Sequence, residues 1–218
     1  MISIKNLKLG YIREFYALYD INLEVKKGEK VAILGQEDSG KTSLLRILAK
    51  LQKPTSGEVT INGMPLQKID YAVDLSVAFL PFHPILFENK TVRKNIEYVL
   101  NIRQIPKEEL LNLTDTILKD FALDTFAKSK VKYLSLYQKR LLQFAMLSVR
   151  NKIDLLLIDD IFIGLNEKER KTIFEMTKSF INRDETTAIF ATKEEGTANE
   201  LCSRIVKLHL GSIQNEEE

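Results

Sequence analysis

The stretch from Gly35 to Thr42, with the sequence GQEDSGKT, constrains this chain more than any other feature, because it matches the phosphate-binding loop G-x-x-x-x-G-K-[ST] in full. An apolar run at residues 31–34 precedes it, and residues 43–49 have the apolar spacing of a helix. A glycine-rich turn between a strand and a helix points several backbone N–H groups, and the positive end of the helix dipole, at one phosphate chain. We therefore predict a nucleoside triphosphate site.

Each residue of this loop has an expected part in that site. Lys41 should reach the β- and γ-phosphates, and the Thr42 hydroxyl should ligate Mg²⁺. The residues expected to surround the phosphates are Gly35, Gln36, Glu37, Asp38, Ser39, Gly40, Lys41, Thr42 and Ser43.

Composition limits the remaining possibilities. A chain of 218 residues with 44% hydrophobic residues can form one large domain, or a core with a subdomain. A net charge of +2 gives no strong field toward nucleic acid, so no nucleic-acid partner is expected. The single cysteine, Cys202, excludes an internal disulfide. No leader peptide and no run near the ~20 apolar residues of a membrane span are found, so we expect any membrane association to come through a partner.

Hydrophobic periodicity predicts an α/β core interrupted by a helical block. Alternating or continuous apolar runs predict strands, and Asn62-Gly63 predicts a tight hairpin. Strands are expected at 2–9, 20–25, 30–34, 58–61, 77–80, 155–158, 187–190 and 204–209. Helices are expected at 43–49, 92–102, 106–121, 135–150 and 166–182, with a short one after 190.

A second phosphate-chemistry motif follows the strand at 155–158. Four apolar residues lead directly into Asp159 and Asp160. In a fold built on a phosphate loop, the first carboxylate of such a strand end lies beside the Mg²⁺ site. Asp159 is therefore a candidate metal ligand, although a polar strand end or a helix cap would look the same.

The order and spacing of these motifs, over nearly all 218 residues, resemble the nucleotide-binding subunits of ATP-binding-cassette (ABC) transporters. Tyr11 stands where the family carries an aromatic side chain that stacks on adenine. The sequence PTSGEVTING at 54–63 is similar to a standard family segment. Leu134-Ser-Leu-Tyr-Gln138 falls at the family signature L-S-G-G-Q, and Leu165-Asn166 matches the end of the family S-A-L-D loop.

Four departures from the family pattern bear on mechanism. Phe82 occupies the slot of a glutamine that links Mg²⁺ and water to the transport domain, and a phenyl ring cannot hydrogen-bond. Leu136 and Tyr137 replace the signature glycines, so side chains should obstruct a partner's γ-phosphate, although Ser135 can still cap the helix.

The other two departures affect the candidate catalytic residues. Asp160 replaces the glutamate that positions the attacking water, and its side chain is about 1.5 Å shorter. Lys193 replaces the histidine that contacts the γ-phosphate, although an ordinary exposed lysine at a strand end fits equally well.

The resemblance implies a fold class: a P-loop NTPase (RecA-like) α/β core with an antiparallel β subdomain and an inserted helical subdomain. We expect one ABC ATP-binding domain over 1–218, with its core at 1–82 and 151–218 and its helical subdomain at 83–150. The implied function is binding of ATP and Mg²⁺ within a transporter complex, driving or regulating subunit closure with slow or absent hydrolysis. The implied partners are an integral membrane transport subunit and a second nucleotide-binding subunit, identical or different. The implied location is the cytoplasmic face of the membrane.

Two other classes of protein remain open at the level of sequence. Residues 151–154 match the guanine-reading motif N-K-x-D, which would indicate a GTPase. That motif should follow a strand, however, whereas here it precedes one. A regulatory or scaffolding ABC module in a membrane complex, for example one of cell division, would share every motif above. Co-purification with a membrane subunit would separate such a scaffold from a transporter.

Overall fold

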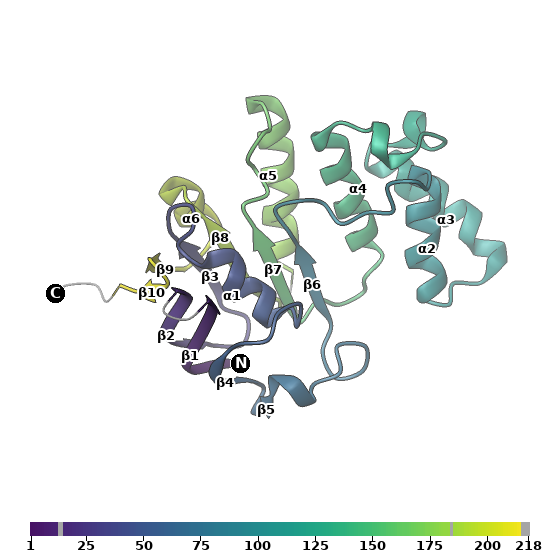
Figure 1. Cartoon of the computed structure of the whole chain (residues 1–218). Helices are drawn as coiled ribbons and strands as arrows, with labels where there is room; N and C mark the ends of the chain where they lie inside the picture. The colour runs from purple at the N-terminus through teal and green to yellow at the C-terminus, as the bar shows by residue number, and fades with distance from the viewer. Residues whose placement is uncertain (13–14, 184, 215–218) are drawn as a thin grey trace. The chain divides into compact units, whose positions relative to one another are not determined.

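The computed structural model of the chain describes residues 1–12, 15–183 and 185–214, and the side chains of 11, 12 and 15 lie outside the description. The chain divides into two units, drawn in Figure 1. The first unit comprises Met1–Phe82, Lys152–Asp160 and Lys178–Glu218, and the second comprises His83–Asn151 and Ile161–Thr177. Within the described ranges, no helix is long and apolar enough to cross a membrane.

A six-stranded sheet forms the centre of the first unit. Its order is β10-β9-β3-β8-β7-β6, and all neighbouring strands are parallel except the β9–β10 pair. β7 and β8 are buried along their whole length, which agrees with the apolar runs at 155–158 and 188–191 within them. The strands are β3 (Lys30–Leu34), β6 (Val77–Leu80), β7 (Leu155–Asp159), β8 (Thr187–Thr192), β9 (Arg204–His209) and β10 (Ser212–Ile213).

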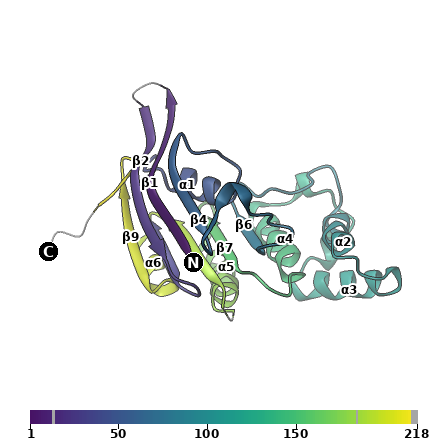
Figure 2. The same cartoon turned by 90° about the horizontal axis from the view of Figure 1, so that it is seen from below.

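An antiparallel sheet of order β2-β1-β4-β5 completes the strands of this unit. Figure 2 shows its two long strands, β1 and β2, running side by side. Asn62 and Gly63 both have positive φ, 52° and 78°, as the tight turn between β4 and β5 requires. The strands are β1 (Ile2–Ile12), β2 (Phe15–Val25), β4 (Ser56–Ile61) and β5 (Met64–Pro65).

Two helices pack on the strands of the first unit. α1 (Lys41–Leu48) contacts β7 and β8 of the parallel sheet and β2 of the antiparallel sheet, and α6 (Glu195–Leu201) contacts β3, β8 and β9. The apolar side chains of α1 are fully buried in one cluster with those of both sheets. The start of α1, at the phosphate loop, is therefore fixed by packing on three strands.

The second unit is helical. It contains α2 (Val92–Ile102), α3 (Lys107–Asp120) and α4 (Leu136–Ser148), with α2 in contact with both α3 and α4. α5 (Glu167–Ile181) begins in this unit, and its residues from Lys178 onward are grouped with the first. Two short 3₁₀ helices of this unit lie at Asp124–Phe126 and Val131–Tyr133, and a third, at Leu66–Lys68, belongs to the first unit.

The predicted fold class is confirmed, and most predicted elements are present. The strands at 30–34, 77–80 and 204–209 and the helix at 92–102 have the predicted bounds. Two early boundaries were wrong: β2 begins at Phe15 rather than 20, and α1 begins at Lys41 rather than 43. The whole of 151–218 was assigned to the core from sequence, whereas the structure groups Ile161–Thr177 with the helical unit.

Candidate functional site

The phosphate loop connects the carboxyl end of β3 to α1. Gly35 N donates to Thr192 O at the end of β8 (3.1 Å), and Ser39 N donates to Gln36 O (3.3 Å). Gly40 has φ of +101°, and a Cβ there would lie 2.4 Å from Ala17 O. No side chain fits at that position, so the second motif glycine is required by both conformation and space.

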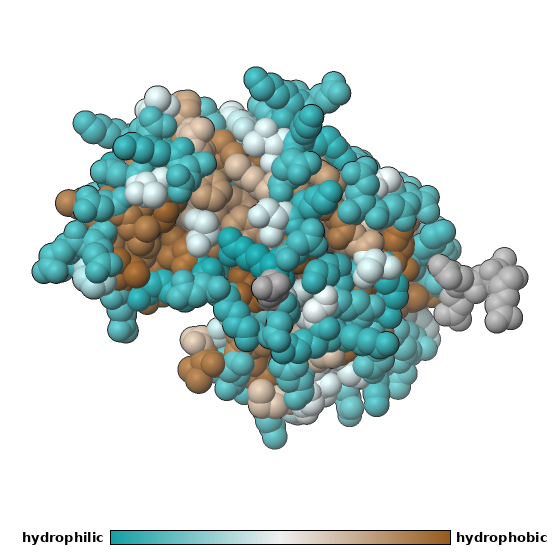
Figure 3. All heavy atoms as spheres, turned by 180° about the vertical axis from the view of Figure 1, so that it is seen from behind, coloured by the Kyte–Doolittle hydropathy of each residue, from teal (hydrophilic) through white to brown (hydrophobic). Residues whose placement is uncertain are grey.

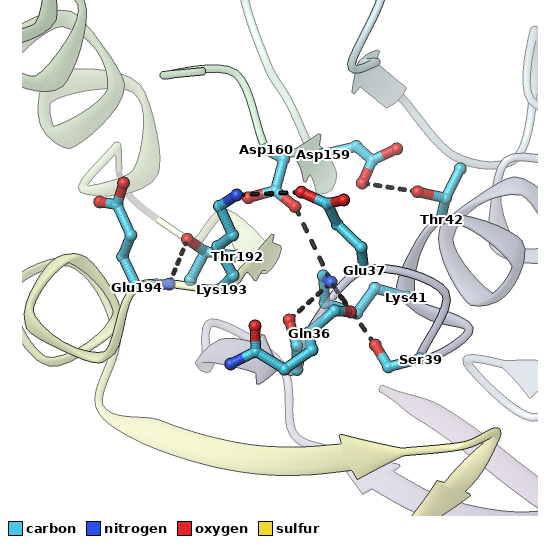
Figure 4. Close-up of polar contacts among 11 residues, drawn as sticks. Gln36, Glu37, Ser39, Lys41, Thr42, Asp159, Asp160, Thr192, Lys193 and Glu194 are labelled. Atoms are coloured by element: carbon cyan, nitrogen blue, oxygen red, sulfur yellow. Dashed lines mark hydrogen bonds and ion pairs between the residues drawn. The ribbon is translucent and has the colours of Figure 1, made fainter.

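Lys41 lies within the loop, with 5% of its surface exposed. Its Nζ donates to Gly35 O (2.7 Å) and Gln36 O (2.8 Å), and Ser39 Oγ is 3.5 Å away (Figure 4). Burial lowers the pKa of Lys41, while the nearby charge of Asp160 acts in the opposite direction. A cation whose hydrogen bonds are to neutral carbonyls is ready to exchange them for the charge-assisted bonds of a phosphate.

Thr42 and Asp159 lie together at the ends of different elements. Thr42 Oγ1, on the first turn of α1, donates to Asp159 Oδ1 at the end of β7 (3.1 Å). One hydroxyl and one buried carboxylate are hard oxygen donors of the kind that Mg²⁺ accepts together with water and phosphate oxygens. Among the described residues, no three or more His, Cys, Asp or Glu side chains form a metal cluster. The pair therefore fits a magnesium ion held jointly with a phosphate ligand.

Asp160 follows in a strained backbone conformation, with φ of 43°. Its N donates to Ala191 O (3.0 Å), and its Oδ2 lies 3.9 Å from Lys41 Nζ. Burial raises the pKa of Asp160, the charge of Lys41 lowers it, and Asp159 raises it further. Figure 4 shows the carboxyl group of Asp160 directed toward Lys41. A carboxylate with a raised pKa beside the phosphate site has the character of a general base.

Lys193 follows β8 and reaches the phosphate loop. Its Nζ lies 3.0 Å from Glu37 Oε1, and Figure 4 shows this contact above Lys41. The hydrogen bond from Lys193 lowers the pKa of Glu37, and the same contact raises the pKa of Lys193. Both groups are thus held in their charged forms at neutral pH.

The structure thus gathers Lys41, Thr42, Asp159, Asp160 and Lys193 within the first unit, at the carboxyl ends of β3, β7 and β8. That edge of a parallel sheet is where ligands bind in α/β folds. Of the other loop residues, Ser39 is buried, Ser43 is half-buried, and Gln36, Glu37 and Asp38 are exposed. Tyr11 belongs to β1, but its side chain lies outside the described part of the chain.

The signature segment is part of the second unit. Ser135 Oγ accepts a hydrogen bond from Gln138 N (3.2 Å), and Gln138 Oε1 accepts one from Ser135 N (2.9 Å). This capping box confirms that Ser135 caps the helix. Leu136 packs close to Gly164, where an added Cβ would lie 3.0 Å from its Cδ2. Leu136 and Tyr137 are half-buried.

The guanine-reading motif has a different part in the structure. Asp154 Oδ2 accepts a hydrogen bond from Ser76 N (2.9 Å), and Lys152 Nζ lies 2.7 Å from Asp154 Oδ1. Asp154 precedes β7, whereas the phosphate loop follows β3, so the two lie at opposite ends of the parallel sheet. The geometry argues against a GTPase.

One supporting contact was missed from sequence. Gly211, in the turn between β9 and β10, donates from its N to Ser39 O (3.0 Å) and accepts at its O from Tyr19 N (2.7 Å). A Cβ on Gly35 would lie 2.4 Å from Leu208 O. The hairpin of β9 and β10 therefore contacts the phosphate loop at Gly35 and Ser39 and helps to hold it in place. The Leu-Gly pair at 210–211 indicates a turn in the sequence, but it does not indicate a contact with the phosphate loop.

The fold and this edge of the sheet define the chain as a P-loop nucleotide-binding protein. Residues 18–162 match the family model described as ABC transporter, and the chain belongs to that family. It is 32% identical over 202 residues to the sulfate/thiosulfate import ATP-binding protein CysA of Synechocystis sp., covering 92% of this chain and 56% of that protein. It is also 32% identical to a probable CysA of Chlorella vulgaris, with 97% of this chain and 89% of that protein covered.

A solved structure matches the fold over the whole chain. It is a dimeric post-hydrolysis state of the ATP-binding cassette MJ0796 bound to ADP and Pi, with a TM-score of 0.84 and 28% identity. The match covers 100% of this chain and 98% of that one. The chain nevertheless spans just over half the length of the CysA proteins of Synechocystis sp. and Bacillus cereus, at 56% and 57%.

Proposed function

We propose that this chain is the ATP-binding subunit of an ABC transporter complex and that it binds Mg-ATP with weak or absent hydrolysis. The observation that carries the proposal is the buried Lys41 inside an intact phosphate loop, next to the Thr42–Asp159 pair. Loop amides and Lys41 would hold the phosphates, and Thr42 and Asp159 would hold Mg²⁺. When bound, Mg²⁺ neutralises phosphate charge.

Weak hydrolysis is proposed from the residues that differ from the family pattern. The side chain of Asp160 is one methylene shorter than the glutamate of the family pattern, and its Oδ2 lies 3.9 Å from Lys41 Nζ. Leu136 and Tyr137 place side chains at the start of α4, where the family pattern has glycines. These changes affect water positioning and phosphate approach, whereas the loop that binds the nucleotide is intact.

The transport role rests on the relatives. The two CysA relatives of Synechocystis sp. and Chlorella vulgaris are named as import ATP-binding proteins. MetN of Helicobacter pylori, a methionine import ATP-binding protein, is 28% identical over 98% of this chain. We propose an integral membrane transport subunit and a second nucleotide-binding subunit, identical or different, as partners. The location would then be the cytoplasmic face of the membrane. We also propose that residues 1–218 form one ABC ATP-binding domain.

The test measures nucleotide binding and turnover separately. Isothermal titration with Mg-ATP should give saturable binding. K41A should weaken this binding by about 10²-fold, because it removes charge-assisted hydrogen bonds to the phosphates. GTP should bind only weakly. Phosphate release, alone and with the co-purified complex, should stay well below the usual enzyme median of about 10 s⁻¹. Turnover near that value would contradict the weak-hydrolysis proposal, and absence of binding would contradict the whole function. Purification without any integral membrane subunit would instead favour a soluble scaffold.

A further inference from the structure

The ion pair between Glu37 and Lys193 joins two neighbouring strands at the nucleotide site. Glu37 belongs to the loop after β3, and Lys193 follows β8, the strand paired with β3. Their charged atoms are 3.0 Å apart, and the side chains are 80% and 37% exposed respectively. An ion pair this exposed contributes little to stability. Its effect must come from where it holds the Glu37 carboxylate.

That position matters because Glu37 is an acidic residue inside an anion-binding loop. α1 begins at Lys41 with Gly40 as its N-cap, and no side chain caps it. No acidic residue lies in its first turn either. The N–H groups there favour a carboxylate for the same reason that they favour a phosphate. A Glu37 side chain released from Lys193 is thus a competitor for the phosphate site within the same chain.

We propose that Lys193 is a positioning residue for nucleotide binding, which acts by holding the Glu37 carboxylate away from the loop amides that receive the phosphates. This inference rests on the proposed ATP binding. It gives Lys193 a role that differs from direct contact with the γ-phosphate. Lysine suits this role, because its flexible stem carries a charge that reaches from the end of β8 to the loop.

The charges around the pair are consistent with this role. The pKa of Glu37 is lowered chiefly by its hydrogen bond from Lys193, with a smaller contribution from Lys41. The carboxylate is therefore charged at neutral pH and is repelled by a triphosphate. The charges of Asp160 and Glu194 also raise the pKa of Lys193, but the side-chain hydrogen bond from Lys193 Nζ is to Glu37.

A double-mutant cycle on Glu37 and Lys193 tests the proposal, with ATP and ADP affinities measured by calorimetry in the presence of Mg²⁺. K193A should weaken both nucleotides about fivefold, because a competing carboxylate reduces the fraction of open loops and both ligands need the same amides. In the E37Q background, K193A should weaken nucleotide affinity by about twofold or less, because only the loss of one screened charge remains. The thermal midpoint should change little in every variant.

Matched variants separate this mechanism from general electrostatics. K193R keeps the cation and should restore most of the affinity. D38N removes the same charge as E37Q but from the neighbouring loop position. Since Glu37 is unchanged in this background, K193A should still weaken nucleotide affinity by about fivefold. Lys27 and Glu185 form a similar exposed pair (2.9 Å) before β3 and β8, at the opposite end of the same strands. K27A should therefore change nucleotide affinity by less than twofold.

Two outcomes would overturn the inference. If K193A weakens ATP much more than ADP, and does so at least as strongly without Glu37, then Lys193 contacts the terminal phosphate directly. If the unchanged protein binds no nucleotide at all, the proposed function fails first and this inference falls with it. Nucleotide binding by the unchanged protein distinguishes the two failures, because it is lost only if the proposed function itself is wrong.

Discussion

Replacing Asp160 with glutamate should raise ATP hydrolysis. Asp160 lies at the carboxyl end of β7 with its Oδ2 3.9 Å from Lys41 Nζ, so its carboxyl group is within the site but on a short side chain. D160E adds one methylene, about 1.5 Å of reach. A misplacement of about 1 Å can cost on the order of 10²-fold in rate, which corresponds to about 2.7 kcal/mol of barrier. The variant should therefore recover up to about 10²-fold in kcat.

The assay is phosphate release at saturating Mg-ATP, with affinity measured in parallel by titration. D160E should change kcat while the ATP affinity stays within about threefold, because the added group acts on the attacking water rather than on the bound phosphates. D160N is the matched control: it keeps the side-chain size and removes the base, so any residual turnover should fall. Equal turnover in all three proteins would refute the reasoning that Asp160 limits hydrolysis.

The same residue predicts a pH-dependent change in stability. The pKa of Asp160 is raised above its usual value, chiefly by burial. Ionised Asp160 therefore destabilises the fold. This penalty is complete above the raised pKa of the folded protein, declines as pH falls through that value, and is absent below the pKa of the unfolded chain. D160N should raise the thermal midpoint at pH 7, and the gain should shrink as pH falls toward 4. A gain that is constant with pH would contradict the linkage.

Further variants test other parts of the structure. K41A should weaken Mg-ATP binding by about 10²-fold in titrations, since it removes charge-assisted bonds of about 1.5–3 kcal/mol each, and K41R should restore only part of it. S135A should lower the free energy of unfolding in denaturant by about 1 kcal/mol through loss of the cap on α4. L45A, which truncates a fully buried side chain of α1, should lower the free energy of unfolding by about 2–5 kcal/mol in the same measurement. L136G together with Y137G should raise hydrolysis in the assembled complex but leave ATP affinity of the isolated chain unchanged.

The elements predicted best from sequence are those whose residues carry their own signals. The strand of four apolar residues before Asp159 and the loop from Gly35 to Thr42 are local patterns, and both are present as predicted. The Asn62-Gly63 turn was equally plain, because only residues that accept positive φ fit there. The early start of β2 was missed because Tyr16 and Tyr19 interrupt the apolar alternation on an exposed part of the strand.

Contacts between distant parts of the chain could not be predicted in the same way. The bond from Gly211 to Ser39 joins the last hairpin to the phosphate loop, and the Glu37–Lys193 pair joins residues 156 positions apart. The sequence placed Lys193 at the end of a strand, but which group it contacts depends on β3 and β8 being neighbours. Strand order is a property of the sheet, and no local pattern carries it.

Binding and hydrolysis depend on different kinds of groups, and this explains why one can be retained without the other. In the proposed function, backbone amides of the loop bind most of the phosphate chain, and the loop is positioned by packing of β3, β8 and α1 and by the hydrogen bond from Gly211. Changing a side chain at the end of β7 or β8 leaves that packing intact. Hydrolysis requires a carboxylate placed to within a fraction of an ångström, so the proposal expects the shorter side chain of Asp160 to reduce it. A chain under selection for ATP-dependent closure alone would keep the packing but not the exact reach of the carboxylate, which is the combination proposed here.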